Sequence, residues 1–302
     1  MRICSLTPSG TEIVCALGLA DQLIGVSHRC NYPPAVMGRP VVSQLLVRQA
    51  SSGEIDTALD AFQEAGHPIY ELDAALMRRL APDVILTQEI CDVCAVPASL
   101  AEELARGLAR EPRLVSVTAS TLEEVLGNVE RLGVVTGRSA EARELLARLR
   151  GRIQRVAETA AGARTRPGVV FLEWLDPPWC AGRWTPELIA LAGGTDVLGR
   201  TGQRSRKVSW SEVVASAPEI VFLSPCGFTI ERTLEEVPRV TTLPEWSALP
   251  AVRAGRVYVC DGELYSRYGP RIVDGLEALA RVIHPELFPG SPPGHLVRPA
   301  GG

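Results

Sequence analysis

Short apolar runs alternate along the chain with longer segments in which hydrophobic residues recur every three or four positions. A short apolar run bounded by turn residues is typical of a buried β-strand, and the longer spacing is typical of an amphipathic helix. Helical patterns separate most of the apolar runs, which predicts parallel sheets built from strand–helix–strand units. The predicted strands are residues 3–6, 23–27, 84–87, 114–117, 169–172, 220–223 and 257–259.

Three capping boxes predict helix starts, because each places a serine or threonine three residues before a glutamate. They are Ser9 with Glu12, Thr121 with Glu124, and Ser209 with Glu212. The first of these helix starts also offers free main-chain N–H groups that could hold an anion.

Two sequence features occur twice and in the same order. Residues 81–86, Ala-Pro-Asp-Val-Ile-Leu, reappear in residues 217–222 as Ala-Pro-Glu-Ile-Val-Phe. Upstream of them, residues 12–18 resemble residues 187–193, and both stretches end in glycine. Such phrases are common in α/β proteins, but their repetition in order favours a duplication. The sequence therefore predicts two similar lobes.

Residues 139–161, between the two repeats, have aliphatic side chains at helical spacing, with arginine and glutamate elsewhere. This pattern predicts an amphipathic helix roughly 35 Å long, at 1.5 Å per residue. A flexible hinge between lobes would instead need a Gly/Ser-rich linker. We therefore expect a rigid helical join.

The predicted fold is α/β, with two Rossmann-like lobes of mainly parallel strands, one long α-helix that joins them, and a ligand cleft between the lobes. The first lobe carries an insertion over about residues 33–70, and the tail, rich in proline and glycine, is expected to be disordered. The predicted parts are residues 1–120 for the first lobe, 121–163 for the connecting helical segment, 164–288 for the second lobe and 289–302 for the tail.

Composition and charge exclude several classes of protein. The net charge of −4 and the absence of a basic stripe argue against nucleic-acid binding. No apolar run reaches the length of a transmembrane helix. The start lacks a signal-peptide pattern and the eight cysteines are irregularly spaced, so we expect a cytoplasmic monomer with reduced thiols. If the natural start lies upstream of Met1, a missing signal would instead predict a periplasmic or cell-surface protein.

The loops after the predicted strands contain a large share of the aromatic residues. Three of the five tryptophans fall between Trp174 and Trp184, and two of the five tyrosines are Tyr265 and Tyr268. Because parallel α/β sheets bind ligands beyond the carboxyl ends of their strands, these rings suit a planar or bulky ligand. Packing on the local core is the alternative for each ring. Further candidates for ligand binding at strand ends and helix starts are Ser9, Thr11, His28, Gln88, Arg267 and Tyr268, with Trp174 among the tryptophans.

Cys91 and Cys94 form a C-x-x-C motif, and His28 and Cys30 lie on a neighbouring strand-end loop. Thiolate and imidazole ligands together suit zinc or iron. The thiols could instead form a redox pair with lowered pKa, or be small buried hydrophobic residues. One C-x-x-C motif does not choose among these three.

Short motifs spread over about residues 2–285 resemble the helical-backbone class of substrate-binding proteins, which serve ABC importers of vitamin B12, haem and iron–siderophores. Their order along the chain is more specific than any single motif. The motifs of the first half are Pro8-Ser9-x-Thr11-Glu12, Gly25-Val26-Ser27, Tyr32-Pro33-Pro34 and Leu80-Ala81-Pro82-Asp83-Val84-Ile85. Those of the second half are Ala192-Gly193-Gly194, Trp210-x-Glu212, Ala217-Pro218-Glu219, Gly255-Arg256-Val257 and Gly269-Pro270-Arg271.

Within that class, Asp176-Pro177-Pro178-Trp179 with Gly182, and the later Tyr265-x-Arg267, resemble the cobalamin-binding branch. The resemblance implies two lobes, a rigid connecting helix, a corrinoid held between aromatic side chains, and an ABC permease as partner. The residues that it places in the cleft are Arg29, Tyr32, Trp179, Trp184 and Tyr265.

We therefore expect a protein that binds a corrinoid, such as cobalamin, or a related metal chelate, without catalysis. A thiol- or metal-dependent enzyme that uses His28, Cys30, Cys91 and Cys94 is the alternative. A third reading is a partner-binding module, in which the protein's own side chains would fill the cleft.

Overall fold

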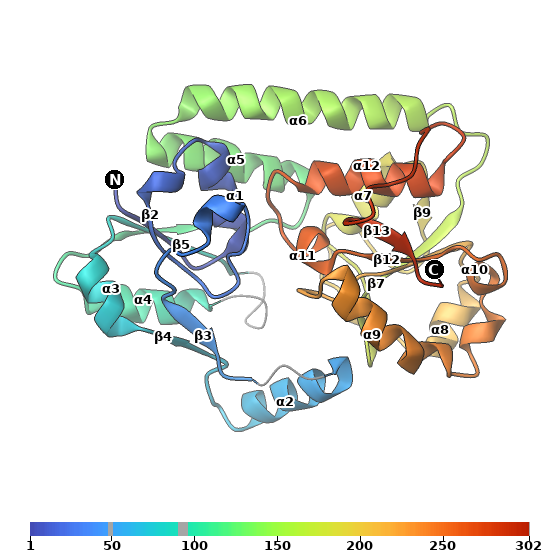
Figure 1. The fold of residues 1–302 in the computed structure, drawn as a ribbon, viewed down its shortest axis with the longest axis horizontal. Coiled ribbons are helices and arrows are strands. Elements are labelled where there is room, and N and C mark those ends of the chain that lie inside the picture. Colours follow the sequence, from blue (N-terminus) through green and yellow to red (C-terminus); the bar gives the residue numbers. More distant parts are fainter. Residues whose placement is uncertain (48–50, 90–95, 302) are drawn as a thin grey trace.

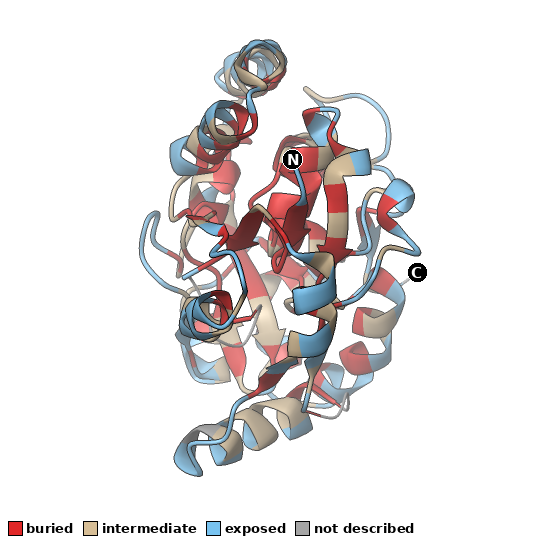
Figure 2. Cartoon of the chain, turned by 90° about the vertical axis from the view of Figure 1, so that its left-hand side faces the viewer, coloured by how far each residue is buried: buried red, intermediate tan, exposed pale blue. Residues whose placement is uncertain are grey.

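The computed structural model describes residues 1–47, 51–89 and 96–301, and it shows two α/β lobes side by side under one long helix (Figure 1). This is the fold class that the sequence predicted. Buried residues gather along the sheets and on the inner faces of the helices, as Figure 2 shows. Within the described residues, no helix combines the length and hydrophobicity of a membrane span.

The described part of the first lobe is built on a four-stranded parallel sheet in the order β2-β1-β5-β6. Its strands are β1 (Ile3–Ser5), β2 (Leu23–Val26), β5 (Val84–Thr87) and β6 (Arg113–Ser116), each at a predicted apolar run. Its helices are α1 (Pro8–Ala16), the short 3-10 helix η1 (Ala20–Gln22), α3 (Ala74–Leu80) and α4 (Ala98–Arg106).

The insertion forms a small unit of its own. After the 3-10 helix η2 (Pro34–Val36), β3 (Ser43–Leu45) and β4 (Tyr70–Leu72) pair as an antiparallel ribbon. Between these strands, α2 (Ser52–Glu64) extends away from the first lobe and passes below the gap between the lobes (Figure 1).

The second lobe has a mixed sheet in the order β10-β8-β7-β11-β12-β13, with β9 beside β7. β7, β11 and β12 are parallel, whereas β8, β10 and β13 run antiparallel to their neighbours. The strands are β7 (Gly168–Leu175), β8 (Pro178–Cys180), β9 (Thr195–Asp196), β10 (Arg206–Lys207), β11 (Ile220–Leu223), β12 (Val257–Cys260) and β13 (Val297–Pro299). The helices are α7 (Thr185–Leu191), α8 (Trp210–Ala215), α9 (Ile230–Thr241), η3 (Trp246–Ala248), α10 (Pro250–Arg253), α11 (Gly262–Tyr265) and α12 (Ile272–Ile283).

The tail is ordered where the sequence predicted disorder. β13 pairs antiparallel with β12, and Val297 is 1% exposed. Its composition pointed to disorder, but the tail has a sheet edge to pair with, and pairing supplies the hydrogen bonds that a short polar segment lacks alone.

Two helices join the lobes. α5 (Leu122–Thr136) packs on the first lobe, and α6 (Ser139–Ala160) spans both lobes as the predicted long helix (Figure 1). Gly137, with φ of +71°, ends α5 in the left-handed region that glycine adopts without strain. One hydrophobic cluster runs from β1 and α1 through α5 and α6 to α7 and α12, so the join is packed along its length.

The internal repeat has a structural counterpart. Ala81 and Ala217 both adopt positive φ, +40° and +45°, at the end of the helix before a central strand. Asp83 then accepts a hydrogen bond from the N–H of Arg2, and Glu219 accepts one from the N–H of Gly168. In each lobe, the repeated segment therefore joins two adjacent parallel strands in the same way.

Two of the three predicted helix caps are present. Thr121 accepts a hydrogen bond from the N–H of Glu124, and Ser209 forms a complete capping box with Glu212. The prediction for Ser9 is wrong, because α1 begins at Pro8, so that Ser9 lies inside its first turn.

Candidate functional site

A cleft of about 900 Å³ lies between the two lobes. Strand-end loops of both lobes and one side of α2 line it. Figure 1 shows α2 below the gap between the lobes. Pockets of this size bind organic ligands in many proteins. Because the cleft is open, its own side chains do not fill it as a ligand-free partner-binding module would require.

The second lobe contributes an aromatic wall, which consists of Trp174, Trp179 and Phe228. β7 extends beyond the predicted strand and turns at Asp176-Pro177 into β8, so that Trp174 and Trp179 are cross-strand partners. Such partners project from the same face of a sheet. Phe228, in the loop after β11, packs edge-to-face on Trp174 with ring centroids 5.4 Å apart.

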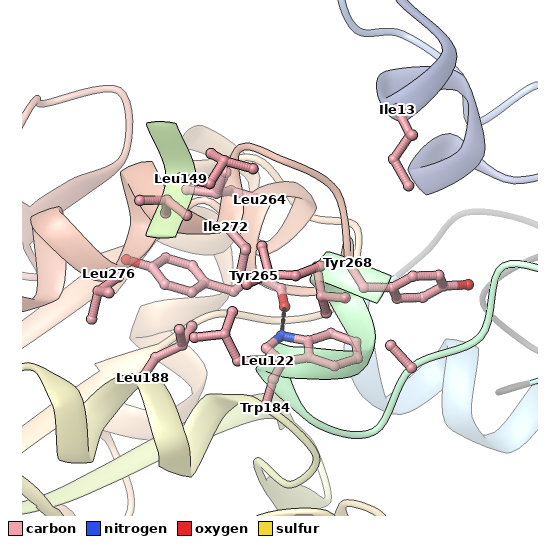
Figure 3. Packing of buried hydrophobic residues seen from close by; sticks show 14 of the residues in the cluster. Ile13, Leu122, Leu149, Trp184, Leu188, Leu264, Tyr265, Tyr268, Ile272 and Leu276 are labelled. Carbon is pink, nitrogen blue, oxygen red and sulfur yellow. Dashed lines mark hydrogen bonds between the residues drawn. The ribbon is translucent and has the colours of Figure 1, made fainter. Parts of the chain in front are cut away.

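Trp184, Tyr265 and Tyr268 border the cleft but are 4%, 3% and 3% exposed. The Trp184 indole N–H donates to the main-chain oxygen of Tyr265 at 3.1 Å, and Figure 3 shows both rings among aliphatic side chains. The Tyr265 hydroxyl donates to the main-chain oxygen of Gly275 at 2.9 Å. These rings therefore support the cleft from behind, in the core. Within the aromatic wall, Trp174 and Trp179 are intermediate in burial and offer the more accessible ring faces, whereas Phe228 is 8% exposed and packs behind Trp174.

Two basic side chains lie over the aromatic wall. The Lys207 ammonium is 5.5 Å from the centroid of Trp179, and the Arg232 guanidinium is 4.9 Å from that of Phe228. Cations in this position are attracted to the ring faces. The wall therefore suits a ligand that combines a large unsaturated framework with hydrogen-bond acceptors.

The first lobe reaches the cleft with Ser9, Arg29 and Gln88. The Arg29 guanidinium donates to the main-chain oxygen of Gly227 at 3.1 Å, and the N–H of Tyr268 donates to the Ser9 hydroxyl at 3.2 Å. The Tyr268 hydroxyl donates to the Gln88 side chain. All three contacts cross from one lobe to the other, so the lobes are tied together at this margin of the cleft.

A buried ion cluster strengthens the same margin. Glu12 accepts hydrogen bonds from Arg271 at 2.6 and 3.0 Å and pairs with Arg267 at 3.4 Å. Glu12 is 4% exposed and Arg267 6%. Removing Glu12 would deprive both arginines of this buried partner, which is costly. Arg267, predicted as a binding residue, therefore borders the cleft while its charge is engaged between the lobes.

Thr11 and Tyr32 do not line the cleft, although both were predicted to bind ligand. Thr11 is fully buried, and its hydroxyl donates to the Cys30 sulfur at 3.1 Å. Tyr32 faces a separate hollow of about 300 Å³ beside α12, where Arg271 lies 3.7 Å over its ring. The loop after β2 turns away from the cleft beyond Arg29, a direction that its position after a strand does not specify.

His28 faces the insertion and is also absent from the cleft. Its Nδ1 shares a hydrogen bond with the Ser43 hydroxyl at 2.9 Å, and its ring is tilted against Tyr70 with centroids 5.6 Å apart. Burial first, and then the positive charge of Arg29, lower the pKa of His28 to about 4. The imidazole is therefore neutral near pH 7.

Of the proposed metal ligands, the structure describes His28 and Cys30, and Cys30 is engaged by hydroxyl groups. Its sulfur is buried between the hydroxyls of Thr11 and Ser27, and burial raises the pKa of the thiol. Cys91 and Cys94 lie outside the described residues. Among those that are described, no three His, Cys, Asp or Glu side chains are grouped to hold a metal ion. Cys226, a thiol that does line the cleft, belongs to the second lobe.

Several cleft residues were not predicted from the sequence. The pattern of α2, with apolar residues three and four apart, indicates a helix, but not that the helix folds below the cleft. Phe228 lies in a strand-end loop and could have been chosen on the same grounds as Trp174. The cleft residues missed in this way include Ile55, Asp56, Leu59, Asp60, Lys207, Phe228 and Arg232.

The chain is similar to known proteins over almost its whole length. Residues 3–264 match the family described as periplasmic binding protein. An uncharacterized ABC transporter substrate-binding lipoprotein of Bacillus subtilis is 25% identical over 295 residues, which cover 95% of this chain and 81% of that protein. A vitamin B12-binding protein of Vibrio cholerae is 25% identical over 281 residues, which cover 91% and 86%.

Solved structures share the fold. A periplasmic heme-binding protein of Pseudomonas aeruginosa has a TM-score of 0.71 at 24% identity, with 94% of this chain and 92% of that chain covered. The periplasmic vitamin B12-binding protein of Vibrio cholerae has a TM-score of 0.68 at 21% identity, with 93% and 96% covered. Likeness at this identity establishes the two-lobed architecture.

Proposed function

The chain belongs to the periplasmic binding protein family, as its motifs predicted, and we propose that its cleft binds a corrinoid or a closely related metal-chelate macrocycle for an ABC importer. The observation that carries this proposal is the aromatic wall, Trp174, Trp179 and Phe228, in a cleft of about 900 Å³. Rigid rings at an angle to one another offer large contact area at little cost in side-chain entropy.

The names of the relatives support this class of ligand. The sequence relatives include proteins named for vitamin B12 binding, and the solved structures include proteins named for heme binding. Corrins and haems are both large metal-bearing macrocycles with polar substituents. The aromatic rings suit the flat macrocycle of such a molecule, and Lys207 and Arg232 beside them suit its polar substituents.

An import role requires a membrane permease as partner and access to ligand on the outer side of that membrane. The lipoprotein and periplasmic names among the relatives support that location, rather than the cytoplasm that the sequence alone favoured. The protein would act there as a monomer, with both lobes presented to the permease.

The enzyme alternative has less support from the described residues. Cys30 is buried with a raised pKa, so its thiolate is disfavoured. His28 is neutral and bonded to Ser43. Neither side chain lines the cleft in which a substrate would bind.

Titration of the protein with cyanocobalamin tests the proposal, followed by calorimetry and by the absorption spectrum of the corrin, with haemin in a parallel titration. We expect saturable one-to-one binding of at least one of the two. The Trp179→Ala variant should bind roughly 5- to 150-fold more weakly, because a buried aromatic contact contributes about 1–3 kcal/mol.

Trp210→Ala is the matched control, because Trp210 packs against Trp246 in the core of the second lobe, outside the cleft. Its affinity per folded molecule should equal that of the unchanged protein. Absence of heat and of any spectral change with both macrocycles, up to high micromolar concentrations, would refute the proposed ligand class.

A further inference from the structure

The insertion helix α2 lies below the gap between the lobes, on the side away from α1, the helix that contains Glu12 (Figure 1). Toward its C-terminal end, Leu59 and Phe62 pack on the hydrophobic cluster of the first lobe that contains Tyr70 and Ile69. Its N-terminal turn instead contacts the second lobe. The helix therefore belongs to one lobe by its packing and to the other by its polar contacts.

The first polar contact is at the N-terminus of α2. The main-chain N–H and the hydroxyl of Ser52 both donate to one carboxylate oxygen of Glu236, on α9, at 3.2 and 2.8 Å. A second carboxylate of the same lobe, that of Asp176, is so close to Gly53 that an added methyl group would lie 2.5 Å from its oxygen. Carboxylates stabilise a helix N-terminus, where the helix dipole is positive.

The second polar contact is one turn further along α2. The Lys207 ammonium pairs with Asp56 at 3.0 Å and lies 3.9 Å from Asp60. Both acidic residues line the cleft, and Lys207 also lies over the ring of Trp179. This ion pair therefore joins α2 directly to the aromatic wall.

We propose that α2 is a latch over the ligand cleft, held to the second lobe by Glu236 and Lys207, and that its release admits and frees the ligand. This inference rests on the proposed function in one respect: it takes the cleft to be the ligand site. The opposite margin of the cleft is tied by the buried ions of Glu12, Arg267 and Arg271. α2 thus forms the margin that can open.

The strength of the contacts suits a latch. The Lys207 side chain is 45% exposed, and exposed ion pairs are weak and sensitive to salt. Residues of α2 are mostly intermediate or exposed in burial, as the lowest helix in Figure 2 shows. The Lys207 contact is therefore the weaker of the two, whereas the contact between Ser52 and Glu236, which are 0% and 4% exposed, is buried and is the main hold on the helix.

Hydrogen–deuterium exchange of the full chain, read by mass spectrometry over α2, tests whether these contacts hold the helix. Lys207→Met should speed exchange of the α2 amides roughly two- to five-fold, the range expected for one partly exposed ion pair. Glu236→Ala should speed it more, because it removes a buried acceptor of two hydrogen bonds from Ser52. Glu64→Gln removes a negative charge from the exposed C-terminal end of α2, where a carboxylate opposes the helix dipole, so it should not speed exchange. The charge-swapped pair Asp56→Lys with Lys207→Asp should return exchange toward that of the unchanged protein.

The labelling rate of Cys226 by a bulky maleimide, read peptide by peptide, tests whether α2 controls access to the cleft. Cys226 lines the cleft, and the half-buried Cys15 of α1, outside it, is an internal reference. In the Glu236→Ala variant, maleimide should label Cys226 faster by the same factor by which α2 exchange rises. Glu236 does not line the cleft, so its loss can affect this labelling only through α2. Cys15 should be unaffected.

Unchanged α2 exchange in both Lys207→Met and Glu236→Ala would overturn the latch, and so would faster exchange with unchanged labelling of Cys226. Neither readout uses a ligand. A failure of cyanocobalamin and haemin to bind would therefore remove the proposed function without deciding the latch.

Discussion

Asp196, at the end of β9, has a buried carboxyl group of which only one oxygen accepts hydrogen bonds. Its Oδ1 accepts hydrogen bonds from the N–H groups of Leu198 and Gly199 at 3.0 and 2.6 Å. Its Oδ2 is buried and has no hydrogen-bond partner among the described residues. Burial outweighs the two N–H donors and raises the pKa of Asp196 to about 6.

This shift predicts how stability depends on pH. The folded pKa of about 6 exceeds the ordinary value of 3.8, so the contribution of Asp196 to stability is complete below pH 3.8 and is lost as the pH rises through 6. Between pH 4 and 8, the unfolding free energy of the unchanged protein should therefore fall by roughly 2–3 kcal/mol relative to that of Asp196→Asn. Urea unfolding of both proteins across this range measures the difference.

The comparison with the variant is necessary because His28 acts in the opposite direction. Its pKa is lowered from 6.5 to about 4, so its contribution to stability is lost as the pH falls through that window. His28 is the same in both proteins, and its effect cancels in the difference. Parallel stability curves for the two proteins would contradict the assignment to Asp196.

The sequence predicted correctly that aromatic residues gather at the cleft, but not which of their rings face it. Trp174 and Trp184 are both tryptophans near the same strand end, yet one forms part of the aromatic wall and the other lies in the core. The difference depends on whether the indole N–H meets a main-chain oxygen of α11, as that of Trp184 does. Such a partner lies 81 residues away in sequence, and a local pattern does not contain it.

At the scale of secondary structure, the α5–α6 corner depends on close helix contact. A Cβ atom on Gly133 would lie 2.4 Å from the Cβ of Ala142 and 3.1 Å from the main-chain oxygen of Arg138. The two helices can approach this closely because both positions carry small residues. This contact sets how α6 leaves the first lobe.

Gly133→Ala should therefore destabilise the protein, by about 1–3 kcal/mol, because overpacking forces the helices apart. The helix propensity of alanine would act in the other direction, by up to about 1 kcal/mol. Adding Ala142→Gly removes the opposing methyl group and should recover part of the loss, which thermal or urea unfolding of the single and double variants measures. A Gly133→Ala protein as stable as the unchanged one would show that the contact is looser than described.

Helices and strands with a clear hydrophobic pattern of their own could be predicted from the sequence. Elements that form only because a neighbouring segment binds them could not. The strands of both sheet centres and the helix from Ser139 follow from local patterns. β8 and β13 are only three residues long and each contains a proline, so their own sequences do not indicate strands. They form because β7 and β12 offer edges to pair with. The position of α2 likewise depends on carboxylates of the second lobe, Glu236 above all.

At the scale of the whole molecule, one hydrophobic cluster is shared by the two lobes, and each lobe has a further cluster of its own. The cluster that contains Ile3 and Ile13 of the first lobe continues through Leu145 and Leu149 of α6 to Ile283 of α12. Arg152, on α6, also pairs with Asp274 and Glu277 of α12. Neither lobe can therefore unfold without exposing apolar surface of the other.

We expect a single cooperative unfolding transition for the full chain, in place of the two that separate lobes would give. Calorimetric and van't Hoff enthalpies should agree, and circular dichroism and tryptophan fluorescence should give one midpoint. Three of the five tryptophans lie in the cleft segment and all five lie in the second lobe, so fluorescence follows that lobe alone. A fluorescence midpoint separated from that of circular dichroism would indicate independent lobes.

β13 covers the edge of the second-lobe sheet at β12. Without it, β12 would present a row of unpaired main-chain groups at the edge of the second-lobe sheet, a template on which another copy could add a strand. Pro299 and Arg298 make β13 itself a poor template, because proline lacks the N–H group and arginine adds charge. The proline- and glycine-rich composition of residues 289–302 would suggest removing them as a disordered tail. A protein shortened to Phe288 would, however, expose the β12 edge, and we expect it to aggregate more readily.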